Sequence, residues 1–373
     1  MPEKAGLRPF FNYCKPRAAR ATKIRIMLFS FSSLLLQRQF MKLITTSVLA
    51  LTMALSGCAG MQAASPTVSI LVDLDPASVD RTFIIESITA GRDGVLYVPD
   101  RVTGNILRVD PKSPKPEVVG KIDSRTVDGK KVDASPSGIL FDDKGDLYIA
   151  AGPFSEVVRI RAAELNTAKP GVAQTFATGL PGANGIAFDK RGHLFVSGGA
   201  SGIVYSVGPN GGAAQAIAQI DKNTRTLPDG KAQQAIVANG LEFDKAGVLH
   251  VADTSRGAIW KVVIGADGKG GTPALLAQSP LLEGADSMAF HSKGDLWVAA
   301  NELNAIVSVS PAGVVKTITN NASQGPLEFP SALVFVGNVA YVANFDVARR
   351  VNMDANGTTA KDGVGASIAQ IVP

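Results

Sequence analysis

The feature that most constrains the fold is a repeat of about fifty residues that begins near residue 86. Each copy has a short alternating run, a turn and a second short alternating run. Apolar residues recur in steps of two, which is typical of strands and argues against a helical repeat. The six copies are ESITAGRDGVLYVPD from Glu86, SGILFDDKGDLYIAA from Ser137, NGIAFDKRGHLFVSG from Asn184, NGLEFDKAGVLHVAD from Asn239, DSMAFHSKGDLWVAA from Asp286, and the shorter SALVFVGNVAYVAN from Ser331.

The turn within each copy predicts a β-hairpin. In two copies Gly192 and Gly247 provide the positive φ that a tight hairpin needs. A third strand-like run, such as EVVRIR or GIVYSV, follows each hairpin, and a looser fourth run often comes after it. Helices are almost absent, with only the AAEL stretch near Ala162 hinting at a helical turn. The pattern predicts an all-β fold, a six-bladed β-propeller with four antiparallel strands per blade.

Two strand-like segments outside the six copies are expected to close the ring. TVSILVDLD from Thr67 precedes the first copy, and ASIAQIVP from Ala366 follows the last. One terminus should complete the blade that the other begins, because closure leaves only short sheet edges unpaired. We therefore expect the propeller to span residues 67–373.

The N-terminal part of the chain has the sequence pattern of an export signal. Residues 41–57 combine a basic start, an apolar stretch and small residues before Cys58. The tetrapeptide Leu55-Ser56-Gly57-Cys58 resembles the lipobox of bacterial lipoproteins, which implies that Cys58 is lipidated and becomes the first mature residue. We expect 58–66 to form a tether, and 1–40 to be an extension that arises from a mispredicted start. The alternative is that 1–40 is a long basic beginning of the signal.

Charge and cysteine content argue against nucleic-acid binding and against a disulfide in the mature domain. Of 37 basic and 32 acidic residues, nine basic and one acidic residue precede Cys58, which leaves 28 − 31 = −3 for the mature chain. No basic arm survives to bind nucleic acid. The two cysteines, Cys14 and Cys58, leave the mature domain without a disulfide. We expect a monomer in the bacterial cell envelope, held by a lipid anchor alone; Ala59 favours the outer membrane, facing the periplasm.

Oxygen-bearing side chains stand just before the first strand of every copy. In a propeller this strand lines the channel, so these positions form a ring around one end of it. Carboxylate and amide oxygens without Cys or His suit a hard divalent cation, and a wide flexible mouth suits calcium better than magnesium. The alternative is that these residues only cap turns, although Glu86 has no turn preference. The six positions are Glu86, Ser137, Asn184, Asn239, Asp286 and Ser331.

The second strand of each hairpin ends at the same face. Its last residues, Asp100, Asp253, Asn301 and Asn344, are therefore expected near the mouth. Asp253 is a candidate base or acceptor for a substrate hydroxyl, or equally an ordinary aspartate at a strand end.

No histidine is placed for catalysis. His193 and His291 lie in or beside hairpin turns at the far end of the channel, and His250 lies within a strand. A carboxylate is therefore expected to act as the general base.

The pattern resembles the family of senescence marker protein, gluconolactonase and luciferin-regenerating enzyme over roughly residues 80 to 350. The resemblance implies a six-bladed propeller that hydrolyses a lactone with a bound divalent metal. It also implies that Glu86, Asn239 and Asp286 hold the metal, and that Asn184 contacts the metal or the substrate.

The leading hypothesis is therefore a calcium-dependent hydrolase of a lactone or related ester, with Asp286 or Asp253 taking a proton from the attacking water. The main alternative is a non-catalytic NHL-like binding propeller anchored as a lipoprotein. A redox propeller lacks the cysteine pairs and ligand histidines it would usually need. The substrate itself is not named by the sequence, because specificity is expected in irregular loops such as DKNTRTLPDGKAQQ from Asp221.

Overall fold

The computed structural model describes residues 65–75, 83–226, 230–321, 325–345 and 365–373. The predicted extension, the signal, Cys58 and all but the last two residues of the tether lie outside these ranges. Within the described ranges no helix combines the length and apolar character that crossing a bilayer would require.

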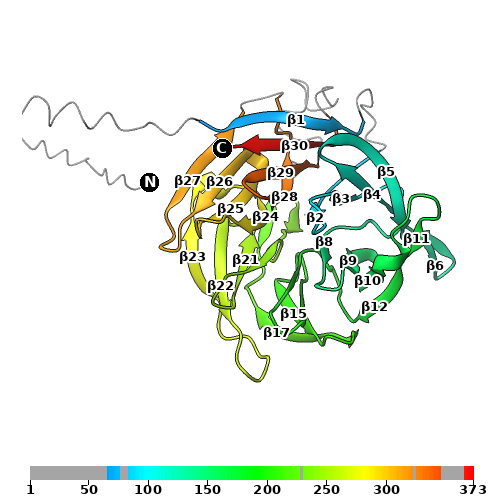
Figure 1. The fold of residues 1–373 in the computed structure, drawn as a ribbon. Helices are drawn as coiled ribbons and strands as arrows, with labels where there is room; N and C mark the ends of the chain where they lie inside the picture. The colour runs from blue at the N-terminus through cyan, green and yellow to red at the C-terminus, as the bar shows by residue number, and fades with distance from the viewer. Residues whose placement is uncertain (1–64, 76–82, 227–229, 322–324, 346–364) are drawn as a thin grey trace, which may run out of the picture. The chain divides into compact units, whose positions relative to one another are not determined.

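Six sheets, each with four antiparallel strands, stand around a central channel, as the sequence predicts (Figure 1). The first two sheets also have a short outer strand that pairs in parallel, β11(Gly171–Val172) and β16(Gly212–Ala213). In the described ranges, helical structure is limited to four 3-10 turns, Gly152–Phe154, Ala162–Glu164, Pro280–Leu282 and Asn301–Leu303. The strands of each blade are given from the channel outward. The first blade contains β2(Thr89–Ala90), β3(Leu96–Pro99), β4(Asn105–Asp110) and β5(Ser113–Lys121), and the second contains β8(Ile139–Phe141), β9(Leu147–Ala151), β10(Glu156–Ile160) and β12(Gln174–Thr178). The third contains β13(Ile186–Phe188), β14(Leu194–Ser197), β15(Ile203–Val207) and β17(Gln215–Gln219). The fourth blade contains β20(Leu241–Phe243), β21(Val248–Asp253), β22(Ala258–Val263) and β23(Ala274–Gln278). The fifth contains β24(Ala285–Phe290), β25(Leu296–Ala300), β26(Ala305–Val309) and β27(Val315–Asn320). The sixth contains β28(Pro330–Val336), β29(Val339–Asn344), β30(Ser367–Val372) and β1(Thr67–Asp73).

The sixth blade is built from both ends of the propeller. β30 pairs with β29 on one side and with β1 on the other, where Thr67 lies opposite Val372 and Asp73 opposite Ser367. The N-terminal strand is thus the outermost strand of the blade that the C-terminal segment begins. This pairing joins the first and last segments of the domain through backbone hydrogen bonds, so no disulfide is needed to hold the ring closed.

The hydrophobic core is divided into six clusters, and each lies between two neighbouring blades. The cluster between the first and sixth blades joins Val98 to Ala343, both fully buried, and the cluster between the third and fourth joins Phe195 to Leu249. Alternate residues of each strand therefore face opposite neighbours, which explains the period of two in the repeat. The predicted hairpin glycines have positive φ, 79° at Gly192 and 86° at Gly247.

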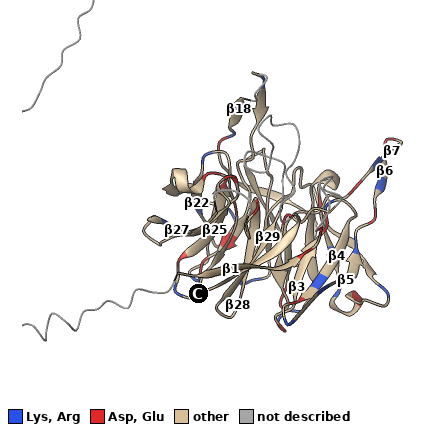
Figure 2. Cartoon of the chain, turned by 90° about the horizontal axis from the view of Figure 1, so that it is seen from above, with Lys and Arg blue, Asp and Glu red and all other residues tan. Residues whose placement is uncertain are grey.

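Two hairpins interrupt the regular blades. β6(Arg125–Val127) pairs with β7(Lys130–Val132), and β18(Thr224–Thr226) pairs with β19(Ala232–Gln234). Both project from the same face of the propeller (Figure 2). The second hairpin belongs to the irregular loop that begins at Asp221.

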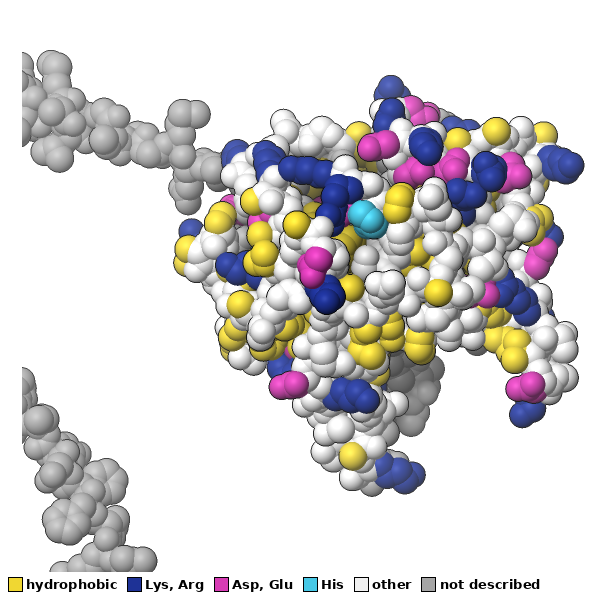
Figure 3. All heavy atoms as spheres, turned by 90° about the horizontal axis from the view of Figure 1, so that it is seen from below, with side chains coloured by type: hydrophobic (Ala, Val, Ile, Leu, Met, Phe, Trp, Pro, Cys, Tyr) yellow, Lys and Arg dark blue, Asp and Glu magenta, His cyan; other side chains and the backbone are white. Residues whose placement is uncertain are grey.

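The outer wall of the propeller has a mixed surface. On the face shown in Figure 3, basic and acidic side chains are interspersed with apolar ones. Among the described residues, the exposed large hydrophobic side chains include Val263 and Val314, which belong to outer parts of the blades. The core therefore lies between the blades and around the channel rather than on this wall.

Candidate functional site

Two cavities meet where the first strands of the blades begin. The channel cavity has a volume of about 310 Å³, and the mouth cavity above it has a volume of about 580 Å³. Four side chains line both cavities and so mark the boundary between them: Glu86, Asn184, Asn239 and Asp286. These four are the residues that the sequence proposes as metal ligands.

The two serines of the predicted ring line neither cavity. The hydroxyl of Ser137 donates to the backbone carbonyls of Ala183 and Asn184, and the hydroxyl of Ser331 donates to the carbonyl of Ala343. Both serines are buried and serve backbone oxygens of the fold. The four residues shared by the two cavities are called the donor set below, because their side-chain oxygens could bind a cation. This set therefore contains two carboxylates and two amides.

Glycines after the ring residues bring neighbouring blades into contact. A Cβ atom on Gly185 would lie 2.4 Å from the carbonyl oxygen of Asn239, and a Cβ on Gly240 would lie 2.5 Å from that of Asp286. Only a residue without a side chain permits this approach. The Asn-Gly pairs of the repeat therefore place Asn184, Asn239 and Asp286 on successive blades whose backbones touch.

Arg101 was not foreseen in the site. It follows β3 in the first blade, and its guanidinium forms an ion pair with Glu86. Nη2 also donates to the hydroxyl of Ser135 at 2.8 Å, and the guanidinium carbon lies 5.6 Å from the centre of the Phe345 ring. Burial lowers the pKa of Arg101 to about 10, and the charge of Asp286 opposes that shift. A cation supplied by the chain thus stands beside both carboxylates.

Asp286 and Asn239 are held by partners that orient them. The side-chain amide of Asn301 donates to Oδ2 of Asp286 at 3.1 Å, and both residues are buried. The amide of Asn239 donates to the Thr254 hydroxyl at 2.9 Å, and that hydroxyl donates to the carbonyl of Ala285. Because the Asn239 nitrogen is engaged in this way, its amide oxygen is left to face the cavities.

Asp253 lies outside both cavity linings. Its carboxylate is fully buried and accepts hydrogen bonds from the Ser255 hydroxyl, the Trp260 indole, and the backbone and guanidinium of Arg256. Asp100 and Asn344 in equivalent positions likewise bond to nearby loop groups. Of the four predicted strand-end residues, Asn301 is the one that contacts a member of the donor set.

The residues at the mouth fit a hard divalent cation. Glu86 Oε2 and Asn301 Oδ1 are buried oxygens without a hydrogen-bond partner in the described part of the chain, although Glu86 is paired in charge with Arg101. Within the same ranges no three His, Cys, Asp or Glu side chains converge as a metal group. A cation here would therefore depend on the amide oxygens of Asn184 and Asn239 as well as on Glu86 and Asp286, which is an all-oxygen set.

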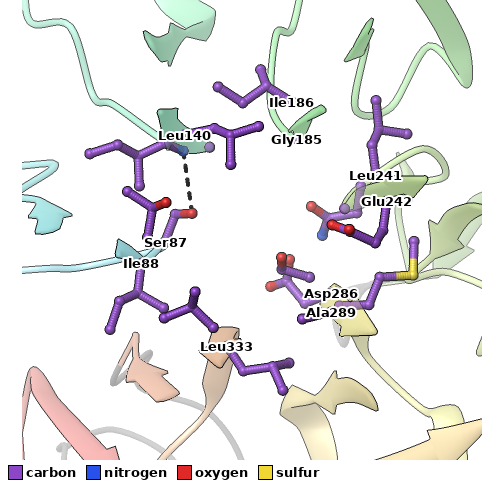
Figure 4. Close-up of a pocket in the computed structure, with 18 of the residues that line it drawn as sticks. Ser87, Ile88, Leu140, Gly185, Ile186, Leu241, Glu242, Asp286, Ala289 and Leu333 are labelled. Atoms are coloured by element: carbon purple, nitrogen blue, oxygen red, sulfur yellow. Dashed lines mark hydrogen bonds between the residues drawn. The ribbon is translucent and has the colours of Figure 1, made fainter. Parts of the chain in front are cut away.

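A third carboxyl group, that of Glu242, points into the channel below the mouth (Figure 4). Burial raises its pKa to about 8. The histidines lie elsewhere: His250 of β21 is packed against Phe290 of β24 in the next blade, and none of the three lines the channel or the mouth.

The predicted specificity loop does reach the site. Its β18–β19 hairpin contributes Arg225 and Gln233 to the wall of the mouth cavity, where Oε1 of Gln233 accepts two hydrogen bonds from the guanidinium of Arg225. The upper wall is therefore polar.

Comparison with protein families gives one match that covers most of the propeller. The model described as "SMP-30/Gluconolactonase/LRE-like region" matches residues 86–342. A search of curated proteins finds no match.

Similar solved structures share the fold at low sequence identity. A luciferin-regenerating enzyme is 15 % identical with a TM-score of 0.58, covering 83 % of this chain and 96 % of its own. A gluconolactonase from Xanthomonas campestris is 14 % identical with a TM-score of 0.57, covering 82 % and 89 %. The calcium-binding protein regucalcin from Agrobacterium tumefaciens is 15 % identical with a TM-score of 0.53, covering 83 % and 93 %. At this identity the likeness supports the propeller fold alone.

Proposed function

Because the chain belongs to the SMP-30/gluconolactonase/LRE-like family, we propose that it is a hydrolase of a lactone or related ester that depends on a divalent cation, most suitably calcium. The observation that carries the proposal is the shared lining of the two cavities by Glu86, Asn184, Asn239 and Asp286. Two carboxylates and two amides at the floor of an open polar cavity can hold a hard cation and leave it accessible from the mouth.

The reaction requires water to attack the carbonyl carbon and the ring C–O bond to break. A divalent cation bound at the mouth would polarise the carbonyl and stabilise the negative charge that develops on its oxygen. Asp286 is suited to take the proton from the attacking water, because it faces both cavities and is oriented by Asn301. That proton then passes to the departing ring oxygen, so the product is a hydroxy acid.

Asp253 is less suited to this role. The side chains that donate hydrogen bonds to its carboxylate belong to its own blade. Asp253 also lines neither cavity. Its hydrogen bonds would have to break before it could accept a proton from water. We assign it to the support of the loop after β21, beside the site.

The test uses full-length protein, a panel of aldonolactones and acyl lactones, and a chelator. We expect wild-type turnover that the chelator abolishes and calcium restores. Asp286→Ala should lose both turnover and calcium binding by titration calorimetry, whereas Asp143→Asn, an exposed acid outside both cavities, should lose neither. Unchanged hydrolysis by Asp286→Ala would exclude the assignment, and absence of wild-type turnover on every lactone would favour a binding propeller.

The proposal also includes a location in the cell, which the sequence of the leader supports. We extend the proposal to a lipid anchor on Cys58 that holds the propeller at the bacterial outer membrane, facing the periplasm, and the support is the signal-like sequence of residues 41–58. Cys58→Ala should move the exported protein from the membrane fraction to the soluble fraction. Retention of this variant in the membrane fraction would contradict the anchor.

A further inference from the structure

Glu242 occupies a position where the other blades carry neutral side chains. It stands three residues after the ring residue of the fourth blade. The same position in the other blades holds a neutral side chain each time, so the repeated fold does not require a charge there. The six residues are Thr89, Leu140, Ala187, Glu242, Ala289 and Val334.

On its channel side Glu242 is surrounded mainly by apolar groups. Within the described part of the chain, no side chain forms a hydrogen bond or an ion pair with its carboxyl group, and burial alone raises the pKa. Part of its surface faces the open channel, where Figure 4 shows the carboxyl pointing inward. The walls around it are formed mainly by aliphatic and aromatic groups: Ile88, Ile139, Leu140, Ile186, Leu241, Met288, Phe290, Leu333 and Phe335.

Such an arrangement is costly unless something binds there. A carboxyl group removed from water without a partner destabilises the fold when it is charged. The cavity has about 310 Å³, which lies at the lower end of the range of small-molecule pockets, about 300 to 1,000 Å³. Glu86 and Asp286 line the mouth end of this cavity, and Glu242 adds one carboxylate among the hydrocarbon walls below them. One carboxylate at that level does not satisfy a divalent metal, which needs six or more oxygens. It does match an ammonium group on a small apolar body.

We propose that the channel below the mouth is a second binding site, for a small organic cation of the alkylammonium class, whose charge is matched by Glu242. The alkyl part packs against Leu140, Leu241 and Met288. Phe290 and Phe335 line the same cavity and add to its apolar wall. This site lies below the donor set and goes beyond the proposed hydrolase activity.

A second cavity borders Glu242 from the end of the channel opposite the donor set. Glu242 and Leu140 also line a separate cavity of about 480 Å³ toward the hairpin turns at the other end of the blades. Basic residues line this cavity too: the amino group of Lys190 donates to the backbone carbonyl of Lys245 in the turn of the next blade at 2.6 Å, and Arg191 pairs with Asp189.

The experiment measures binding of n-butylammonium to the full-length protein by titration calorimetry, with 1-butanol and butyrate as probes of equal chain length. We expect saturable binding of butylammonium, and binding of butanol and butyrate that is at least tenfold weaker. Glu242→Gln keeps the shape of the side chain and should weaken butylammonium binding at least tenfold. Glu117→Gln removes a carboxylate that pairs with Arg108 on the outer strands, so it should leave the affinity unchanged.

Three results would overturn the proposal: no saturable binding of butylammonium to the wild type, equal affinity for butanol, or equal affinity of the wild type and Glu242→Gln. A thermal unfolding curve of each variant without ligand shows whether it is folded. If Glu242→Gln is unfolded, Glu242→Asp replaces it in the same titration. The shorter side chain draws the carboxylate back from the channel, so Glu242→Asp should also bind butylammonium more weakly, and undiminished affinity would again refute the site.

Discussion

Replacing Arg101 tests how the chain's own cation and a bound metal share the mouth. The guanidinium pairs with Glu86, donates to Ser135 and stands near Asp286. A divalent cation that uses Glu86 must weaken this pair and also lie close to a positive charge. Arg101→Gln removes the charge and keeps a polar side chain of similar width. We therefore expect the variant to bind calcium more tightly than the wild type.

The size of the effect follows from charge separation and exposure. Two unit charges 4 Å apart interact by about 4 kcal/mol at an effective dielectric constant near 20. The Arg101 and Glu86 side chains keep 27 % and 12 % of their exposure, so solvent screens part of that energy. An increase in calcium affinity of about 10- to 100-fold, or about 1.4 to 2.8 kcal/mol, is the expected range.

Calcium titration by calorimetry at low and high ionic strength provides the assay, and the gain should shrink as salt increases. Arg125→Gln is the matched control. Arg125 also pairs with a glutamate, Glu156, but it lies on the β6–β7 hairpin and lines neither the channel nor the mouth cavity. If Arg101→Gln binds calcium no more tightly than the wild type, Arg101 does not compete with calcium for Glu86. If Arg125→Gln gains as much calcium affinity as Arg101→Gln, the gain is a general effect of net charge.

Two further predictions concern the fold around the channel. Gly240→Ala should destabilise the protein by about 3 kcal/mol, because its Cβ would meet the Asp286 carbonyl oxygen at 2.5 Å and the Ser287 Cα at 2.6 Å, whereas Gly208→Ala, with open space around its Cβ, should change the midpoint of urea unfolding little. Equal midpoints for the two variants would show that the blades do not touch at this point. The pKa of Glu242 is raised from 4.5 to about 8, so its contribution to stability is fully present below about pH 4.5, declines as the pH rises and is lost above about pH 8. Glu242→Gln should remove that decline in the free energy of unfolding, and a wild-type stability that is flat between pH 5 and pH 8 would contradict the burial argument.

The blades and the donor set were predictable because each depends on local spacing. The period of two, the turn glycines and the polar residue before each first strand recur in every copy, so the alignment alone brings Glu86, Asn184, Asn239 and Asp286 to one end of the channel. The closure by both termini followed from the presence of two unpaired strand segments. In each case the backbone geometry of one blade, repeated around an axis, determines the position.

Arg101 could not be predicted in this way. It lies in a loop after β3, where its path depends on Ser135 in the next connection and on Phe345 after the sixth blade. Contacts between segments so far apart in sequence leave no periodic trace. Asn301 was placed near the mouth by its strand end, but its hydrogen bond to Asp286 depends on side-chain orientation, which spacing alone does not determine.

Glu242, in contrast, did leave a signal in the sequence. The third copy reads NGIAFD and the fourth reads NGLEFD, so the change from Ala187 to Glu242 introduces a charge into an otherwise neutral register. A repeat protein contains its own control for such changes, because blades with the same strand pairing and the same kind of core show which residues the fold needs. Where one copy has a side chain that is less favourable to bury, the requirements of the fold do not explain its presence. The carboxylates at the mouth and in the channel are such departures, and for that reason we assign binding roles to both.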